Sequence, residues 1–262
     1  MKDQLHRPII LKETPKRIVS LVPSQTELLV DLGLEEALVG ITKFCVHPTH
    51  LKEQKTIVGG TKQVHYDKIK ALQPDIILCN KEENTREMIQ ELEKIAPVHI
   101  SDIYTIDDVL DLISLYGTLF SKEGNAHKII NEIAEKKLAF DLFIKDKPKK
   151  STAYFIWKQP WMVAANHNFI DELLHLNGFE NYYQHLERYP EVTLDISRPE
   201  LAELVLLSTE PFPFNENHMQ EVKIFFPNAT VLVVDGEMFS WYGSRLLKAF
   251  EYFKTLHQHH LC

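Results

Sequence analysis

A long amphipathic helix predicted near the middle of the chain constrains the fold most. Residues Ser121 to Lys147 form the longest uninterrupted helical pattern in the sequence. Its apolar residues recur every three or four positions and predict one apolar stripe opposite a charged face: Ile130, Ala134, Leu138 and Leu142, with Ala126, Ile129 and Ile133 beside them. Ser121 can cap the start, and Pro148 can end the helix because proline lacks the helical N–H.

The length of this helix allows two architectures. Roughly 26 residues at ~1.5 Å each span ~39 Å, which is more than the width of a small domain. The helix could therefore join two lobes, or it could lie on a single sheet.

Short apolar strands alternate with helical segments on both sides of the long helix. The predicted strands of the first half are 17–22, 38–41, 56–58, 75–79 and 97–100, and those of the second half are 152–157, 204–207 and 230–234. The helices between them are predicted at 24–33, 64–72, 85–95, 106–119, 169–176, 217–226 and 244–256, with a further helix starting at Ser197–Glu200. This alternation indicates parallel sheets covered by helices. It favours an α/β lobe over residues 1–120, a connecting helix over 121–148 and a second α/β lobe over 149–262.

Composition excludes several classes of protein. The chain has 262 residues, 44% of them hydrophobic and 25% charged, which is ordinary for a globular protein. Its formal net charge of −8 argues against a nucleic-acid partner. The three cysteines, Cys45, Cys79 and Cys262, are few and odd in number, which fits a reducing compartment. No apolar leader or membrane-length segment is recognisable, so we expect a cytoplasmic chain.

The loops that follow the strands of the first half are the first place to look for a ligand site, because ligands of open parallel sheets bind beyond the carboxyl ends of the strands. Ser24 is predicted to cap the helix after the first strand, so Pro23, Ser24 and Gln25 could offer backbone N–H groups to a ligand or form a plain cap. The other candidates are Phe44, Gly60, Thr61, Asn80 and Lys81. For these, an ordinary turn is the alternative.

Aromatic residues mark the corresponding loops of the second half. All three tryptophans, Trp157, Trp161 and Trp241, lie in two loops at the ends of predicted strands, and Arg245 follows the last of them. Such residues could form walls for a flat ligand, with the guanidinium as an anion or cation–π partner. Core packing is the alternative for each tryptophan.

Catalytic and metal-binding patterns are weak. The common motifs for nucleophilic serine, nucleotide phosphates, dinucleotides and zinc are missing from the sequence. Cys45 and His47 share one loop, but two potential ligands are too few for a metal site. We therefore predict no catalytic residues and no metal site.

Taken together, these segments resemble the class III substrate-binding proteins of ABC importers. The resemblance rests on PKRIVSLVPSQTELLVDLG, the aromatic loop ending in His-Pro, VGGTK, LQPDIILCN and the long helix, and it extends from about Pro15 to Leu256. It implies two Rossmann-like lobes joined by a rigid backbone helix, with the ligand held between them and no enzymatic activity. The cobalamin-binding branch is the most similar.

The resemblance also implies the ligand, the partner and the contact residues. The ligand would be a corrinoid or another metal chelate rather than an intrinsic cofactor, and the partner would be an ABC permease. We also expect the chain to be a monomer. Carried over by position, the contacts fall on Pro23, Ser24, Gln25, Phe44, Gly60, Thr61, Trp157, Trp241 and Arg245.

Two features differ from that branch. The polar run 80–84 (NKEEN) replaces an aromatic, and an export signal is not recognisable, although a start further upstream would permit a periplasmic or surface-anchored protein. A cytosolic corrinoid or metal-cofactor chaperone or enzyme, using Cys45, His47 and the polar run, is therefore the alternative function.

Overall fold

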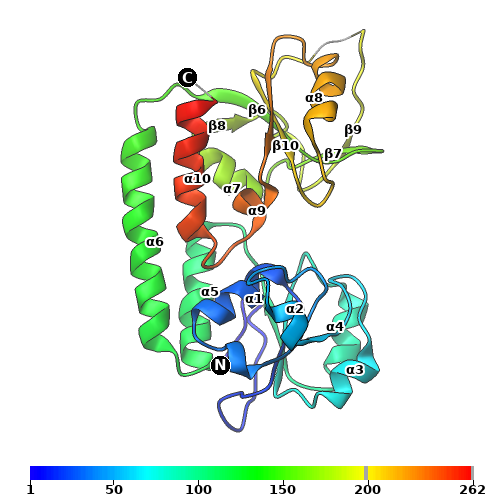
Figure 1. The fold of residues 1–262 in the computed structure, drawn as a ribbon, viewed down its shortest axis with the longest axis vertical. Coiled ribbons are helices and arrows are strands. Elements are labelled where there is room, and N and C mark those ends of the chain that lie inside the picture. The colour runs from blue at the N-terminus through cyan, green and yellow to red at the C-terminus, as the bar shows by residue number, and fades with distance from the viewer. Residues whose placement is uncertain (198–199, 261–262) are drawn as a thin grey trace. The chain divides into compact units, whose positions relative to one another are not determined.

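The computed structural model describes residues 1–197 and 200–260, and it divides the chain into two compact units (Figure 1). The first unit comprises Met1–Glu135 and Trp241–Leu247, and the second comprises Lys136–Ser240 and Lys248–Cys262. Two sequence predictions fall on residues that the structure does not describe. The helix predicted to start at Ser197–Glu200 includes residues 198 and 199, and Cys262 is one of the last two residues, 261 and 262.

A parallel sheet forms the centre of the first unit. Its five strands lie in the order β3-β2-β1-β4-β5: β1 (Ile18–Ser20), β2 (Leu38–Ile41), β3 (Thr56–Ile57), β4 (Ile76–Asn80) and β5 (Val98–Ser101). All five residues of β4 are buried, as its continuous apolar run predicts for a central strand. Reversal of strand order about β1 puts the loops after β1 and β4 at a topological switch point.

Helices connect these strands. They are α1 (Pro23–Asp31), α2 (Leu51–Gln54), α3 (Tyr66–Ala71), α4 (Arg86–Leu92) and α5 (Ile106–Leu119), with a short 3₁₀ turn at Glu35–Ala37. All of them except α2 and the 3₁₀ turn were predicted. The local sequence fixes several starts: Thr85 accepts a hydrogen bond from the Met88 N–H, and Thr105 and Asp108 form a capping box. The predicted Ser24 cap is wrong, because Pro23 takes the first helical position and Val22 precedes it.

The second unit also has a parallel core, but it is extended by antiparallel strands. Its sheet follows the order β11-β10-β6-β7-β9, with β8 paired to β6, and its strands are β6 (Lys150–Trp157), β7 (Trp161–Val163), β8 (Phe179–Asn181), β9 (Glu191–Val192), β10 (Leu204–Ser208) and β11 (Thr230–Val234). The pairs β6–β10, β10–β11 and β6–β8 are parallel, whereas β6–β7 and β7–β9 are antiparallel. The segment between Trp157 and Trp161 is therefore a hairpin turn.

The helices of the second unit are α7 (Phe169–Leu176), α8 (Glu216–Lys223), α9 (Gly236–Ser240) and α10 (Leu246–His259), of which α10 has its first two residues in the first unit. Residues 236–240, part of a segment we expected to be loop, form α9. An added Cβ at Gly236 would collide with Ser208 and Glu210, so the turn from β11 into α9 requires glycine.

The predicted long helix is α6 (Glu123–Ile144), and it runs through the boundary between the units. Ser121 does not cap it, because Ser121 has a φ of 55° and ends the preceding helix. The expected stripe is also wrong in part. Ala126, Ile129, Ile133 and Phe140 are buried, whereas Leu138 and Leu142 are exposed.

Tertiary contacts decided which face of α6 is buried. In the first unit Ala126 packs on Gly117 of α5, and in the second Phe140 lies 6.0 Å from both Phe250 and Phe253 of α10, centroid to centroid. Both apolar faces satisfied a helical period, so the sequence could not distinguish the inner face from the outer one.

Candidate functional site

The first turn of α1 lies directly after β1, where the sequence predicted it, but its polar side chains are buried. Ser24 is 3% exposed and Gln25 is fully buried. The Gln25 side chain donates to the Ser101 hydroxyl at 2.6 Å and to the Tyr242 hydroxyl at 2.9 Å, and its oxygen accepts from Tyr116 at 2.7 Å. Gln25 thus links α1 to β5, to α5 and to a distant C-terminal segment.

That C-terminal segment is Trp241–Leu247, which belongs to the first unit although both flanking stretches belong to the second. Arg245 Nε donates to Glu27 Oε2 of α1 at 2.8 Å, and both side chains are at most 5% exposed. The Arg245 guanidinium lies 4.9 Å from the Trp241 ring centroid, and the His47 ring meets the same indole edge-on at 5.5 Å. Trp241 is only 7% exposed, so it is mostly covered by its neighbours.

Burial shifts the acid–base behaviour of this layer. The pKa of Tyr242 is raised well above its usual range, chiefly by burial and further by the charge of Glu83, while hydrogen bonds from its neighbours oppose the rise. Tyr242 therefore stays a neutral hydroxyl that can both donate and accept hydrogen bonds. The network is preorganised at neutral pH.

The polar run 80–84 is a structured turn after β4. The side-chain oxygen of Asn80 accepts hydrogen bonds from the backbone N–H groups of Glu82 and Glu83. The side-chain oxygen of Asn84 accepts one from the backbone N–H of Asn80. Asn84 also donates to the Thr61 carbonyl at 2.8 Å. Asn80 and Asn84 are each 3% exposed, so their amides hold the loop in shape.

Lys81 is the exposed residue of this turn. Its ammonium group lies 2.6 Å from Asp102 and 3.0 Å from the Tyr104 hydroxyl. The pKa of Lys81 is raised mainly by the hydrogen bond to Asp102, so the side chain is a fixed positive charge.

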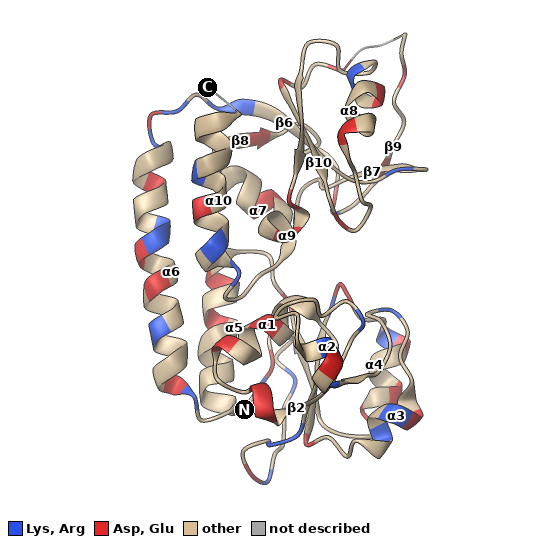
Figure 2. Cartoon of the chain, viewed as in Figure 1, with Lys and Arg blue, Asp and Glu red and all other residues tan. Residues whose placement is uncertain are grey.

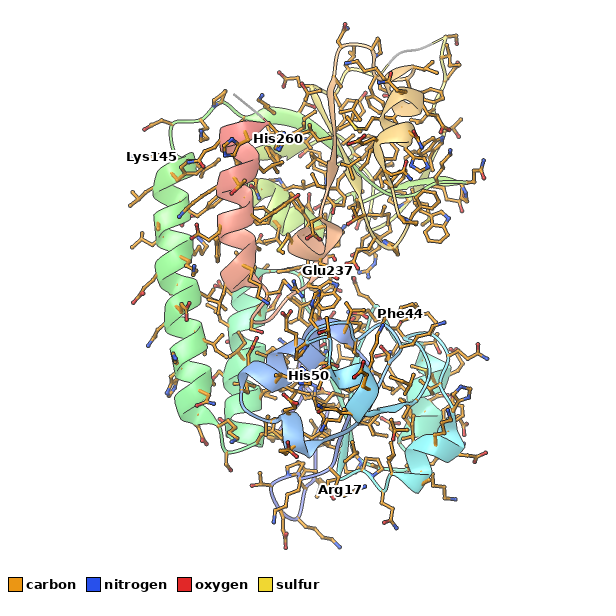
Figure 3. All side chains as sticks on the ribbon, viewed as in Figure 1. Arg17, Phe44, His50, Lys145, Glu237 and His260 are labelled. Atoms are coloured by element: carbon orange, nitrogen blue, oxygen red, sulfur yellow. The ribbon has the colours of Figure 1, made fainter. Side chains whose placement is uncertain are left out.

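The aromatic loop after β2 exposes one ring and buries its thiol. Phe44 is 49% exposed, with the Lys43 ammonium 4.9 Å from its ring centroid (Figure 3). Cys45 is buried, within 3.1 Å of the Thr26 hydroxyl and 3.3 Å of the Thr42 hydroxyl, and burial raises its pKa. Among the described residues no three His, Cys, Asp or Glu side chains converge as metal ligands.

The glycine candidates lie beside this ring. Gly60 is buried, and a Cβ there would approach the Phe44 ring to 3.1 Å, so the chain is closely packed at this point. Thr61 is partly exposed. Phe44, Thr61 and Lys81 are thus the predicted residues of the first unit that keep exposed side-chain surface.

The second unit gathers aromatic side chains at the carboxyl ends of β6 and β10. Trp157 ends β6, is 38% exposed and meets Phe212 edge-on with centroids 5.6 Å apart. Trp161 instead stacks on Phe214 at 6.2 Å and packs against the core of the unit. Sequence reasoning missed Phe212 and Phe214, although the PFPF run after a buried strand could have indicated them.

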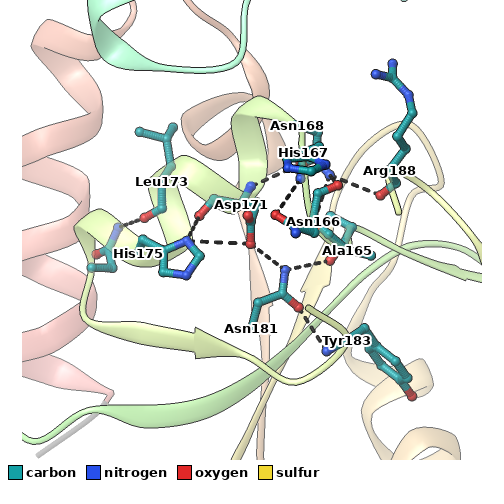
Figure 4. Close-up of polar contacts among 12 residues, drawn as sticks. Ala165, Asn166, His167, Asn168, Asp171, Leu173, His175, Asn181, Tyr183 and Arg188 are labelled. Atoms are coloured by element: carbon teal, nitrogen blue, oxygen red, sulfur yellow. Dashed lines mark hydrogen bonds and ion pairs between the residues drawn. The ribbon is translucent and has the colours of Figure 1, made fainter. Parts of the chain in front are cut away.

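A second polar network in this unit is structural (Figure 4). Asn168 caps α7 by accepting from the Asp171 N–H, and it donates to the carbonyls of Ala165 and Arg188. Asn181 donates to Asp171 at 2.7 Å and to the Ala164 carbonyl at 3.1 Å. These contacts join the loops around α7 to one another.

One cavity of about 590 Å³ lies within the first unit, beside α5. Polar and acidic side chains line much of it, including Gln4, Asp102, Tyr104, Asp108 and Asp111. Its lining differs from the aromatic surfaces expected for a flat ligand.

A model of the "Periplasmic binding protein" family matches residues 18–199, so the chain belongs to that family. An ABC transporter substrate-binding lipoprotein of Bacillus subtilis, YvrC, is 27% identical over 135 residues, which are 50% of this chain and 42% of that one. A vitamin B12-binding protein of Vibrio parahaemolyticus is 22% identical over 185 residues, 70% of this chain and 67% of that one. The match thus spans less than half of the first of these relatives.

The fold matches solved structures over a larger part of the chain. A periplasmic heme binding protein of Pseudomonas aeruginosa has a TM-score of 0.81 at 20% identity, covering 94% of each chain. The predicted α/β fold and class of protein are confirmed, and the family is one of binding proteins rather than enzymes.

The expected cytoplasmic location is wrong. The family is one of periplasmic binding proteins, and the relatives named include a lipoprotein and a periplasmic protein. Cysteine count misled the prediction, since a chain that buries a large core needs no disulfides in either compartment. Among the helices of residues 1–197 and 200–260, none is long and apolar enough to cross a bilayer.

Proposed function

We propose that this chain is the substrate-binding component of an ABC importer and that it binds a corrinoid or another metal-chelate ligand. The observation that carries the proposal is the pair of exposed aromatic side chains, Phe44 and Trp157, each in a segment at the carboxyl end of its own sheet. Exposed rings at these positions suit a broad, largely apolar ligand face.

The predicted residues fall into two groups by exposure. We propose direct ligand contacts for Phe44, Thr61, Lys81 and Trp157, which keep exposed side-chain surface. Gln25, Asn80, Trp241 and Arg245 would support them, because their side chains are buried in contacts with neighbouring residues. Pro23, Ser24 and Gly60 would contribute backbone, and Trp161 would hold the hairpin behind Trp157.

Two ligand classes deserve priority because the relatives point to them. A vitamin B12-binding protein is among the sequence relatives, and a heme-binding protein is among the structural ones. We favour a corrinoid, since aromatic contacts suit its large face and Lys81 is already paired with Asp102.

Calorimetric titration of the whole chain with cyanocobalamin, haemin and a ferric hydroxamate tests the proposal. We expect cyanocobalamin to bind at micromolar concentration or tighter, and haemin more weakly. Preference for haemin or the hydroxamate would change the ligand within the same function. Failure of all three to bind at several hundred micromolar would contradict the metal-chelate assignment.

A further inference from the structure

The outer face of α6 carries apolar side chains that no part of the described chain covers. Leu138 is 63% exposed and Leu142 is 68% exposed, and Ala134 and Ala139 beside them are also exposed. The opposite face of the same helix carries the buried residues Ala126, Ile129, Ile133 and Phe140. A single exposed leucine is ordinary, but two on one stripe of a long helix form a surface.

The spacing of this stripe is that of a coiled-coil seam. Asn131, Glu135, Leu138, Leu142 and Lys145 follow one another at intervals of four, three, four and three residues, and all five are exposed. Intervals of this kind keep side chains on one side of a helix that pairs with another helix. Lys145 lies just beyond the last residue of α6 (Figure 3), and both signs of charge occur along the helix (Figure 2).

We propose that this stripe, on residues 131–144 of α6 and Lys145 just after it, is a self-association surface through which two copies of the chain pair in antiparallel orientation about a two-fold axis. In an antiparallel pair each a position faces a d position of the other helix. With the axis at residue 140, Leu138 faces Leu142 of the second copy, because the two numbers sum to 280. Glu135 then faces Lys145 of the second copy, because 135 and 145 have the same sum.

Charge selects this arrangement over its alternatives. A parallel pair would place Glu135 on Glu135 and Lys145 on Lys145, and like charges facing each other are unfavourable. Sliding the antiparallel pair by one heptad would set Leu142 against Asn131 or Lys145. Only the register centred on residue 140 joins leucine to leucine and carboxylate to ammonium.

The pair must be weak. Two leucines and two alanines per copy supply far less than the ~800 Å² per partner of a stable interface. We therefore expect a dissociation constant on the order of 0.1–1 mM, so that the expected monomer prevails in dilute solution. The proposal does not depend on the ligand.

Sedimentation equilibrium of the full chain from about 10 µM to about 1 mM, at physiological ionic strength to screen the net negative charge, tests the proposal. We expect the average mass to rise toward that of a dimer. Leu138→Gln with Leu142→Gln should weaken association at least tenfold, whereas Leu201→Gln, which replaces a leucine that is 79% exposed elsewhere, should leave it unchanged. A wild type that stays monomeric throughout, or a double variant that associates as well as wild type, overturns the proposal.

Exchanging the charges of Glu135 and Lys145 distinguishes a specific interface from non-specific association. Glu135→Lys alone and Lys145→Glu alone should each weaken association severalfold, and the two together should restore it, because the pair is re-formed with the signs reversed. Equal association in all three variants would overturn the register.

Disulfide cross-linking tests directly whether the two helices pair in antiparallel orientation. In a Cys262→Ser background, where Cys45 and Cys79 remain buried, an equimolar mixture of Leu138→Cys and Leu142→Cys chains should give mainly the mixed disulfide dimer. Predominance of the two like-with-like disulfides would show a parallel pair and overturn the two-fold arrangement.

Discussion

The two units gather different kinds of side chain at the carboxyl ends of their sheets. In the first, Gln25, Tyr242 and the Glu27–Arg245 pair form a buried polar layer around the start of α1. In the second, Trp157, Phe212, Trp161 and Phe214 form an aromatic group beyond β6 and β10. A buried polar layer is rigid because each partner needs the others, whereas an aromatic surface tolerates ligands of varied shape.

The largest effect should come from breaking the buried ion pair of the first unit. Glu27→Leu or Arg245→Met alone leaves a charge at most 5% exposed without its main partner, which should cost ~3–5 kcal/mol of folding free energy. The double variant should recover most of that loss. Urea denaturation followed by circular dichroism measures both, and single variants costing under ~1 kcal/mol would show that the layer is not what holds Trp241–Leu247 in place.

The next largest effect should distinguish the roles of two tryptophans of the second unit. Trp157→Ala should weaken cyanocobalamin binding by ~2–4 kcal/mol with little change in stability, since this side chain is 38% exposed. Trp161→Ala should instead cost ~3–5 kcal/mol of stability, because Trp161 packs on the core of its unit. Calorimetry measures the affinity of both variants, and urea denaturation measures their stability. If the two changes weakened binding equally, Trp157 could not be assigned as a ligand contact and Trp161 as a structural residue.

Acid should destabilise both units through one buried histidine in each. Burial is the main cause that lowers the pKa of His99 in the first unit and of His257 in the second to about 4. At His99 the Asp3 carboxylate raises the pKa and Arg7 lowers it further; at His257 Lys147 and Lys150 lower it.

Unfolding exposes each imidazole, whose pKa returns to about 6.5, so the unfolded chain binds more protons below that pH. Each histidine therefore stabilises the fold fully above pH ~6.5, and that contribution of up to ~3 kcal/mol is lost as the pH falls toward 4. Melting temperatures from pH 7 to 4.5 should decline less steeply in His99→Gln and in His257→Gln than in wild type. Parallel declines in all three would contradict the shifts.

The smallest effect is expected at Lys81, an exposed residue of the first unit. Lys81→Met removes an ion pair that is 45% exposed on the lysine side, so stability should change by less than ~1 kcal/mol. Affinity for haemin, which carries carboxylates, should fall most, while affinity for cyanocobalamin should fall less, because the lysine charge then meets no carboxylate of the ligand. An equal loss for the two ligands would contradict this difference.

Local sequence signals determined much of the fold. The apolar run of β4, the alternation of strands with helices and the proline after α6 each act over a few residues, and the structure has the predicted elements at these places. Loops also follow β2, β3 and β4 at the predicted places, and the carboxyl ends of these parallel strands lie on one edge of the sheet.

Only tertiary structure decided which of these residues remain exposed. Trp241 and Arg245 read as loop residues of the second half, but they pack on α1 of the first unit, more than 200 positions away in sequence, through the Glu27–Arg245 pair. Leu138 and Leu142 read as core residues, but contacts of Ala126 and Phe140 turned the other face of α6 inward. A helical or strand period reports that a face is apolar, whereas burial of that face depends on distant partners that the local pattern does not contain.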